Sequence, residues 1–342
     1  MRTVILKINA KKPQISGIRR AASIIRRGNL VAFPTETVYG LGADALNAKA
    51  VKKIFVAKGR PADNPLIVHV SDKESVNDLA GDIPQLAEKL ISRFWPGPLT
   101  IVLKKSKTVP KITTGGLDTV AIRMPKNKIA QALIREAGTP IAAPSANFFG
   151  RPSPTLAKHV LDDLDGRISA IIDGGQTRIG IESTVIDLTR KTPMLLRPGR
   201  VTLEELQSAI GRVDVHPILK GKKSALVHRS PGMKYKHYSP DAHVILIEGQ
   251  SALVHKKILK LVQQFGKQGK KVGVITIRGD KYTKNTRRVR TDSEFAANLF
   301  KIFRECDSKK IDVILVQGIP RKGIGLGIMN RLSKAARTKI MA

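Results

Sequence analysis

Leu30-Val-Ala-Phe33 is a short apolar run that leads directly into Pro34-Thr-Glu-Thr-Val-Tyr-Gly40, a polar loop that ends in a glycine. The run predicts a buried strand, and the apolar residues between Ile18 and Ile25 recur on one face of a preceding helix. Ligands of α/β proteins gather where such strands end. Because Thr35 and Thr37 offer hydroxyl groups at that point, the loop is suited to a small polar substrate, although a hydrogen-bonded turn would also explain it.

Helix and strand patterns alternate along most of the chain, which predicts an α/β fold. Residues 1–211 form one unit with a twisted mixed sheet, and its last helix opens on the capping box Thr202-Leu-Glu-Glu205. Residues 241–342 repeat the strand–helix alternation and predict a smaller, Rossmann-like parallel unit. Residues 212–240 are rich in proline, glycine and charge, and are predicted to be a linker, with an aromatic group at Tyr235, His237 and Tyr238 that a plain spacer does not need.

The chain carries a formal net charge of +34 over 342 residues, which favours anionic partners such as phosphates, RNA or acidic membranes. A generally basic or thermophilic proteome would produce the same excess, so the charge does not specify nucleic acid. The single cysteine, Cys306, excludes an internal disulfide and a cysteine-based zinc site. No apolar run approaches the ~20 residues of a membrane span. With no signal-peptide core near Met1, we expect a cytoplasmic protein.

Two cations flank a glycine in Lys58-Gly-Arg60, where a predicted helix over Asn47–Lys58 ends. The following Pro-Ala-Asp-Asn64-Pro turn leads into a strand that carries His69. Turn residues that bring a lysine and an arginine together favour a polyphosphate ligand. His69 alone would more often be a histidine satisfied within the core.

Further polar residues follow other predicted strands. Ala142-Ala-Pro-Ser145-Ala-Asn147 combines small residues with a hydroxyl and an amide, and Ser145 is interpreted as a binding group because no nucleophile elbow surrounds it. Arg123 lies inside a predicted strand, where a buried guanidinium needs an anionic partner such as a substrate carboxylate. Arg197 ends a strand in Leu196-Arg-Pro-Gly199, and Ser153 follows the Gly150-Arg-Pro turn.

Taken in order, these motifs resemble those of the YrdC/Sua5 family, the threonylcarbamoyl-AMP synthases. The resemblance rests on Lys58-x-Arg60 with Asn64 and His69, on Ser145-Ala-Asn147, on Glu182-Ser-Thr184 and on Leu196-Arg-Pro-Gly199. The segment Ser230-Pro-Gly-Met-Lys-Tyr-Lys-His-Tyr-Ser-Pro240 and the C-terminal α/β unit are similar to the longer Sua5 type. The resemblance covers essentially the whole chain, and implies a YrdC-like catalytic domain over 1–211 and a Sua5-type domain over 241–342.

The resemblance implies that L-threonine, bicarbonate and ATP give threonylcarbamoyl-adenylate and pyrophosphate, with Mg²⁺ accompanying ATP on ligands that the sequence does not identify. Separate transferase machinery would then modify adenosine 37 of tRNAs that read ANN codons, and direct tRNA contact is left open. Lys58 and Arg60 would be catalytic. The residues implied to hold threonine are Thr35, Thr37, His69, Arg123, Ala143 and Ser183. Those implied to hold ATP are Lys58, Arg60, Asn64, Thr119, Ser145, Asn147, Ser153, Arg197 and Tyr235.

The chemistry fits a site rich in cations and hydroxyls and poor in carboxylates. A carbamate made from threonine and bicarbonate must attack the α-phosphorus while pyrophosphate leaves, which depends mainly on positioning and charge neutralisation. Because carbamates are labile in water, we expect a lid, and the aromatic segment Pro231–Pro240 is the candidate.

Three other functions would account for some of the same features. A non-catalytic RNA-binding protein would use the positive charge, but the chain has 4% aromatic residues and no RRM, KH or zinc-knuckle motif. A hydrogenase-maturation carbamoyltransferase would need cysteine-rich zinc modules, for which one cysteine is too few. A nicotinamide oxidoreductase would depend on Gly323, Gly325 and Gly327, which precede a predicted helix but have no acidic partner at the expected spacing.

Overall fold

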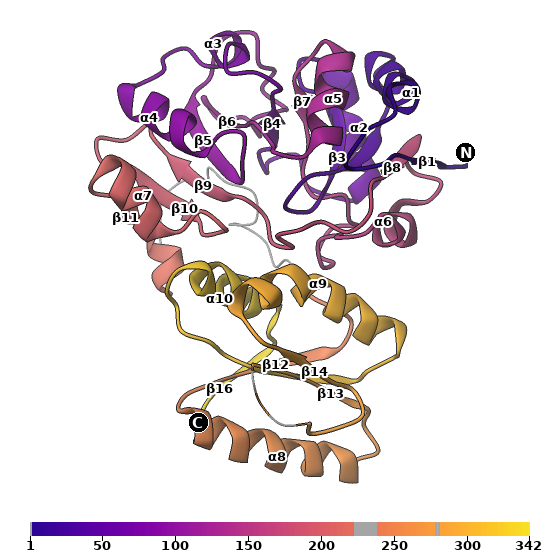
Figure 1. Cartoon of the computed structure of the whole chain (residues 1–342), viewed down its shortest axis with the longest axis vertical. Helices are drawn as coiled ribbons and strands as arrows, with labels where there is room; N and C mark the ends of the chain where they lie inside the picture. Colours follow the sequence, from indigo (N-terminus) through magenta and orange to yellow (C-terminus); the bar gives the residue numbers. More distant parts are fainter. Residues whose placement is uncertain (1, 222–237, 278, 280) are drawn as a thin grey trace. The chain divides into compact units, whose positions relative to one another are not determined.

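The computed structural model describes residues 2–221, 238–277, 279 and 281–342. Within these residues the chain divides into two compact units. The first comprises 2–149 and 153–221, and the second comprises 150–152 together with the described residues from 238 onward. Each unit has its own sheet (Figure 1). No helix in the described part of the chain is both long enough and apolar enough to span a bilayer.

The first unit is built on an 11-stranded mixed sheet in the order β1-β8-β2-β3-β7-β4-β6-β5-β9-β10-β11. Its strands are β1 (Val4–Lys7), β2 (Val31–Pro34), β3 (Tyr39–Asp44), β4 (Ile67–His69), β5 (Leu99–Lys104), β6 (Thr119–Arg123), β7 (Ile141–Ala142), β8 (Ala170–Asp173), β9 (Thr184–Asp187), β10 (Met194–Arg197) and β11 (Asp214–Val215). Its helices are α1 (Ile15–Arg26), α2 (Ala48–Lys58), α3 (Ser75–Leu79), α4 (Gln85–Phe94), α5 (Lys128–Ala137), α6 (Ala157–Leu164) and α7 (Leu203–Ile210), followed by the 3-10 turn η1 (Pro217–Lys220).

Local caps fix where α2 begins and ends. The side chain of Asn47 accepts hydrogen bonds from the backbone N–H groups of Lys49 and Ala50, which satisfies two of the unpaired donors of the first turn. Gly59 ends the helix in the left-handed conformation, with φ of 60°. This turn sets Lys58 as the last helical residue and Arg60 as the first residue beyond the cap.

Apolar packing against the sheet holds the site in position. One core lies between α1, α5 and the strands β2 and β8, and includes Ile18, Val31, Leu133 and Ile172. α1 and α5 lie side by side in this core because both helices present an apolar stripe to the same part of the sheet. The loops that follow β2, β4 and β7 start from strands in which every residue is buried.

The second unit has a five-stranded sheet in the order β14-β13-β15-β12-β16, and every pair of neighbouring strands is parallel. Its elements are β12 (His243–Glu248), α8 (Ser251–Lys267), β13 (Val272–Ile277), β14 (Thr286–Val289), α9 (Asp292–Ser308), β15 (Val313–Gln317), α10 (Ile324–Ala335) and β16 (Thr338–Met341). Figure 1 shows α8 on one face of this sheet and α9 with α10 on the other. Crossover helices thus cover both faces, as parallel sheets require.

The α/β class, the mixed sheet of the first unit and the parallel sheet of the second are confirmed. The predicted capping box is present, since Thr202 accepts from the Glu205 N–H and Glu205 accepts from the Thr202 N–H. The prediction that Gly323, Gly325 and Gly327 all precede a helix is wrong for two of them, because α10 begins at Ile324 and contains Gly325 and Gly327 in its first turns. β11 and η1 lie within the segment predicted as a linker.

Candidate active site

The loop between β2 and β3 is a hydrogen-bonded turn with two buried hydroxyl groups. The Thr35 hydroxyl donates to the carbonyl oxygen of Val38 at 2.7 Å and lies 2.7 Å from the Thr37 hydroxyl. Both threonine residues are almost fully buried. The turn therefore holds Thr37 in a fixed orientation beside the end of β6.

Arg123, the last residue of β6, is held from three directions. Its Nε donates to the carbonyl oxygen of Gly97 at 3.2 Å, and its two terminal nitrogens donate to Thr37 Oγ1 at 3.0 Å and to Glu36 Oε1 at 2.6 Å. The side chains of Arg123 and Glu36 are 4% and 10% exposed, so this ion pair is buried. Three of the five N–H groups of the guanidinium are used in these bonds, which leaves two for a ligand carboxylate.

His69 ends β4 and lies beside Arg123, because β4 and β6 pair in parallel with these two residues in register. Its ring makes an edge contact with the Phe33 ring, with centroids 6.2 Å apart. Burial, reinforced by the positive charge of Arg123, lowers the pKa of His69 to about 3. The imidazole is therefore neutral at physiological pH. β7 lies on the other side of β4, and Ala143 beyond it donates its N–H to the Ile67 carbonyl oxygen.

Lys58 joins α2 to the loop that follows β7. Its ammonium donates to the carbonyl oxygens of Ser145 and Asn147 at 2.6 and 2.5 Å, and the side chain is almost fully buried. The Ser145 hydroxyl donates to Asn147 Oδ1 at 2.5 Å. Lys58 thus fixes the backbone of the Ser145-Ala-Asn147 segment as well as bringing a positive charge to it.

Arg60 lies across the Gly59 cap and holds the next turn. Its NH2 donates to the carbonyl oxygens of Asn64 and Pro65 at 3.1 and 3.0 Å. The Asn64 side-chain amide nitrogen is buried and makes no hydrogen bond to the described residues, which leaves it a donor for a ligand. Thr119 begins β6, about 13 Å along the strand from Arg123 at the usual rise per residue.

A second pair of buried residues lies at the start of β9 and the end of β10. Arg197 donates through Nε to the carbonyl oxygen of Ser183 at 2.9 Å and through NH2 to its hydroxyl at 3.0 Å. The Ser183 hydroxyl also lies 2.7 Å from the Thr100 hydroxyl. One residue earlier, the Glu182 carboxylate accepts a short hydrogen bond from the Ser153 hydroxyl.

Backbone hydrogen bonds join these groups within the first unit. The N–H groups of Ile179 and Gly180 donate to the carbonyl oxygens of Glu36 and Thr37. The segment just before Glu182 therefore lies beside the loop whose side chains bind Arg123. The Tyr39 N–H donates to Pro154, and the Ala146 N–H donates to Tyr39. The predicted residues therefore come together at neighbouring loops of the first unit, with Thr119 at the opposite end of β6 from Arg123. Tyr235 and most of Pro231–Pro240 lie outside the described residues.

Two buried carboxylates, Glu36 and Glu182, are residues that the sequence prediction missed. The expectation of a carboxylate-poor site is thus incomplete, because both lie inside hydrogen-bonded contacts with predicted residues. Both occur within quoted motifs, Pro34–Gly40 and Glu182–Thr184. The available signal was that a buried arginine needs a buried anion, although this signal does not single out Glu36 as the partner.

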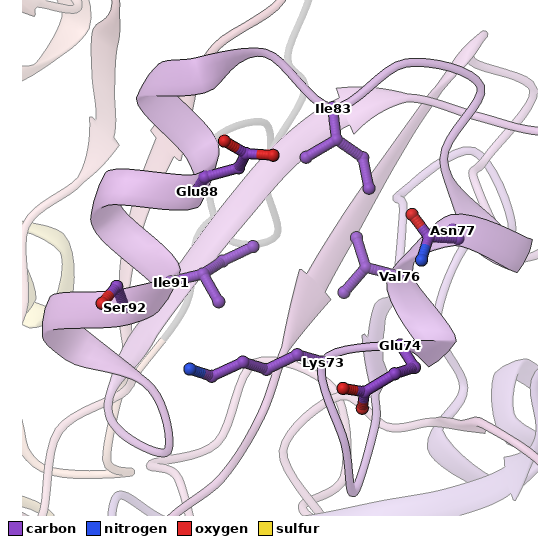
Figure 2. A pocket seen from close by; sticks show the side chains of 8 residues that line it. All are labelled: Lys73, Glu74, Val76, Asn77, Ile83, Glu88, Ile91 and Ser92. Atoms are coloured by element: carbon purple, nitrogen blue, oxygen red, sulfur yellow. The ribbon is translucent and has the colours of Figure 1, made fainter.

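The described residues contain no group of three or more His, Cys, Asp or Glu that could hold a metal ion. Two cavities in the first unit lie away from the predicted residues. One, of about 280 Å³, opens between α3 and α4 over Val76, Ile83 and Ile91, with Lys73 and Glu88 among the polar side chains around it (Figure 2). The other, of about 540 Å³, is lined by residues including Asp72 and Arg135. Neither contains any residue of the candidate site.

Comparisons with known proteins cover the whole chain. The Sua5/YciO/YrdC family model, described as Telomere recombination, matches residues 23–199, and the model described as Threonylcarbamoyl-AMP synthase, C-terminal domain, matches residues 201–337. Threonylcarbamoyl-AMP synthase of Pyrococcus abyssi is 53% identical over 99% of both chains, and that of Bacillus subtilis is 47% identical over 98% of this chain and 96% of its own. A crystal structure of P. abyssi Sua5 complexed with L-threonine has a TM-score of 0.95 at 52% identity, over 99% of this chain and 100% of that one. The chain belongs to the YrdC/Sua5 family, and to its longer members that carry the C-terminal Sua5 domain.

Proposed function

We propose that this chain is a threonylcarbamoyl-AMP synthase, which converts L-threonine, bicarbonate and ATP into threonylcarbamoyl-adenylate and pyrophosphate. The observation that carries the proposal is the gathering of four buried cations, Lys58, Arg60, Arg123 and Arg197, with hydroxyl groups at loops of one unit. The names of the P. abyssi and B. subtilis relatives support the same reaction.

Threonine is assigned to the part of the site around Arg123. The two remaining N–H groups of Arg123 would bind the threonine carboxylate in a bidentate pair. The hydroxyls of Thr35, Thr37 and Ser183, the neutral His69 imidazole and the backbone at Ala143 would surround the rest of the amino acid. The L-threonine complex of the P. abyssi relative supports an amino-acid site in this family.

ATP is assigned to the part of the site around Lys58 and Arg60. These two cations would neutralise phosphate charge, with Arg197 as a third. The side-chain amide of Asn64 has a hydrogen-bond donor to spare. The remaining residues assigned to ATP are Thr119, Ser145, Asn147, Ser153 and Tyr235.

The reaction proceeds in two bond-forming steps. The threonine nitrogen, once deprotonated, forms a C–N bond with bicarbonate and water is lost. A carbamate oxygen then attacks the α-phosphorus, and the bond from that phosphorus to the bridging oxygen breaks as pyrophosphate leaves. Lys58 and Arg60 would stabilise the charge that develops on the phosphate oxygens, and Arg123 would orient the amino acid.

Mg²⁺ would enter as part of the ATP substrate. Magnesium in nucleotide sites is commonly held by substrate phosphates, water and one or two carboxylates. In the described part of the chain, the buried carboxylates of Glu36 and Glu182 already accept hydrogen bonds from Arg123 and Ser153. The phosphates of ATP, together with water, would therefore supply most of the ligands of the ion.

The product would pass to a transferase that modifies adenosine 37 of tRNA, and the enzyme would work in the cytoplasm.

The test is incubation of the purified chain with MgATP, labelled bicarbonate and a panel of amino acids. We expect labelled acyl-adenylate and pyrophosphate with threonine alone. Equal turnover with serine would broaden the substrate class. The absence of product with every amino acid would overturn the proposal and favour a non-catalytic RNA-binding protein.

A further inference from the structure

The two faces of the second unit differ in charge. Its described acidic residues are Asp241, Glu248, Asp292, Glu294, Glu305, Asp307 and Asp312, and four of these lie on α9. By contrast, the sequence from Gly249 to Gly279, which includes all of α8, has six lysines and no acidic residue. The sheet separates α8 from α9 (Figure 1), so the four acidic residues of α9 lie on the opposite face from α8, together with cations of α9 and α10 such as Lys301, Arg304 and Lys334.

The exposed side of α8 is a cationic stripe. Val254, Ile258 and Leu261 are buried against β12, β13 and β15, which fixes the orientation of the helix. Helical periodicity then directs Lys256, Lys260 and Lys267 outward, and all three are exposed. The stripe from Lys256 to Lys267 spans 11 residue steps and is about 16 Å long.

The neighbouring strand and loop extend this stripe. On β14, Arg287 donates to Glu305 of α9 at 3.0 Å, so alternation along the strand turns the exposed Arg288 to the α8 side. The loop before β14 packs on α8 through Tyr282, whose hydroxyl lies 2.8 Å from His255 Nδ1. This loop carries Lys281 and Lys284, both exposed. We define the α8 face as Lys256, Lys260, Lys267, Lys281, Lys284 and Arg288.

We propose that the α8 face is a docking surface for the phosphate backbone of RNA. A row of flexible cations suits a polyanion, and α8 itself carries no acidic residue. The exposed Gln263 and Gln264 between Lys260 and Lys267 can hydrogen-bond to phosphates and 2′-hydroxyls. Insertion into an anionic membrane is the less favourable use, because Val254, Ile258 and Leu261 are buried in the core and Leu253 and Leu259 are the exposed large apolar side chains of α8. The choice of tRNA as the RNA rests on the proposed function.

The experiment compares two variants with equal charge change. Lys256→Glu/Lys260→Glu/Lys267→Glu alters the α8 face, and Lys89→Glu/Lys107→Glu/Lys191→Glu alters exposed lysines of the first unit that lie outside the candidate site. Binding of an unmodified transcript of an ANN-reading tRNA is measured by fluorescence anisotropy over a range of salt concentrations. Vesicles of equal parts phosphatidylglycerol and phosphatidylcholine form a parallel arm.

We expect the α8 variant to bind the transcript at least about tenfold more weakly, and its log-affinity slope against log salt to become shallower by about 1 per lysine removed from a phosphate. The first-unit variant should keep most of the affinity. Equal losses in both variants, no loss in either, or a loss confined to vesicle binding would each overturn the proposal. If the triple variant does not fold, judged by circular dichroism, Lys256→Gln/Lys260→Gln replaces it.

Synthesis of threonylcarbamoyl-adenylate without tRNA is measured on the same three proteins. The α8 variant should retain this activity, because none of its residues lies in the candidate site. A wild-type chain that makes no product would refute the proposed function, and the comparison of RNA binding between the variants could still be interpreted. If all three proteins are active and bind the transcript equally well, only the proposal that the α8 face binds RNA is refuted.

Discussion

Arg123 and Glu36 form an ion pair at the centre of the candidate threonine site, and the pair has two separable consequences. Taking two charges out of water costs free energy that their attraction and hydrogen bonds must offset. Glu36 satisfies this need through Arg123 and the Lys126 N–H. The pair therefore supports the fold, while the two remaining N–H groups of Arg123 support binding.

We predict that Arg123→Met reduces the free energy of unfolding by about 3–5 kcal/mol, because it leaves the Glu36 carboxylate buried without a cation. Arg123→Met/Glu36→Gln should recover much of that loss, since the buried charge is removed as well. The KM for threonine should rise at least about 100-fold in both variants, because both lack the guanidinium. Urea denaturation and steady-state kinetics measure the two effects. Recovery of the threonine KM in the double variant would contradict the assigned role.

His69 provides a prediction about pH. Its pKa is about 3 in the folded chain, through burial and the charge of Arg123, whereas the pKa is near 6.5 when the chain is unfolded. Between these values the unfolded chain binds a proton that the folded chain does not. The free energy of unfolding therefore falls as pH decreases below about 6.5, by about 1.4 kcal/mol per pH unit from this residue.

His69→Gln removes this titration, so the variant serves as the reference for the wild type. The stability of the wild type relative to the variant should shrink by about 2 kcal/mol between pH 7 and pH 5, as measured by urea denaturation. Parallel pH dependences of the two proteins would show that His69 is not held neutral by the fold.

At the scale of helices and strands, two glycine caps form a matched pair. Gly59 ends α2 with φ of 60°, and Gly138 ends α5 with φ of 65°. A Cβ at position 59 would lie 3.0 Å from the Phe148 ring, whereas a Cβ at position 138 would meet nothing within 4 Å. An alanine would therefore strain the backbone at both positions, but its Cβ would meet a close neighbour only at position 59.

We predict that Gly138→Ala costs about 1 kcal/mol of stability and leaves activity unchanged. Gly59→Ala should cost more and should raise the KM for ATP, because the cap sets the positions of Lys58 and Arg60 on either side of it. Thermal denaturation and ATP kinetics separate the two effects. An unchanged KM for ATP in Gly59→Ala would mean that the cap does not position the cations.

Sequence periodicity predicts well those elements that carry a strong apolar pattern and local caps. α2 was predictable to within one residue because Asn47, its apolar stripe and Gly59 act locally. β14 and β16 were not predicted, since Thr286–Val289 and Thr338–Met341 are polar edge strands that depend on pairing with distant partners. In the candidate site, the cations and hydroxyls were predictable from their motifs. The Arg123–Glu36 pair was not, because it joins residues 87 positions apart.

At the scale of the whole molecule, the two units have separate apolar cores. Leu133 on α5 is fully buried in the first core, and Ile258 on α8 is fully buried in the second. The single tryptophan of the chain, Trp95, is buried in the first unit, where its indole N–H donates to the Leu99 carbonyl oxygen at 2.7 Å. Tryptophan fluorescence therefore reports on the first unit, while far-ultraviolet circular dichroism reports on both.

This separation yields a prediction about unfolding. Leu133→Ala and Ile258→Ala should each remove about 2–5 kcal/mol from the unit that holds the residue, through lost burial and the cavity left behind. Leu133→Ala should lower the temperature at which Trp95 fluorescence changes. Ile258→Ala should leave that temperature in place and lower a separate transition seen by circular dichroism, by at least about 8 °C for a unit of this size. If Ile258→Ala shifts the Trp95 transition as far as Leu133→Ala does, the two cores unfold as one cooperative structure. A substitution on the α8 face would then also change the stability of the unit that holds the candidate active site.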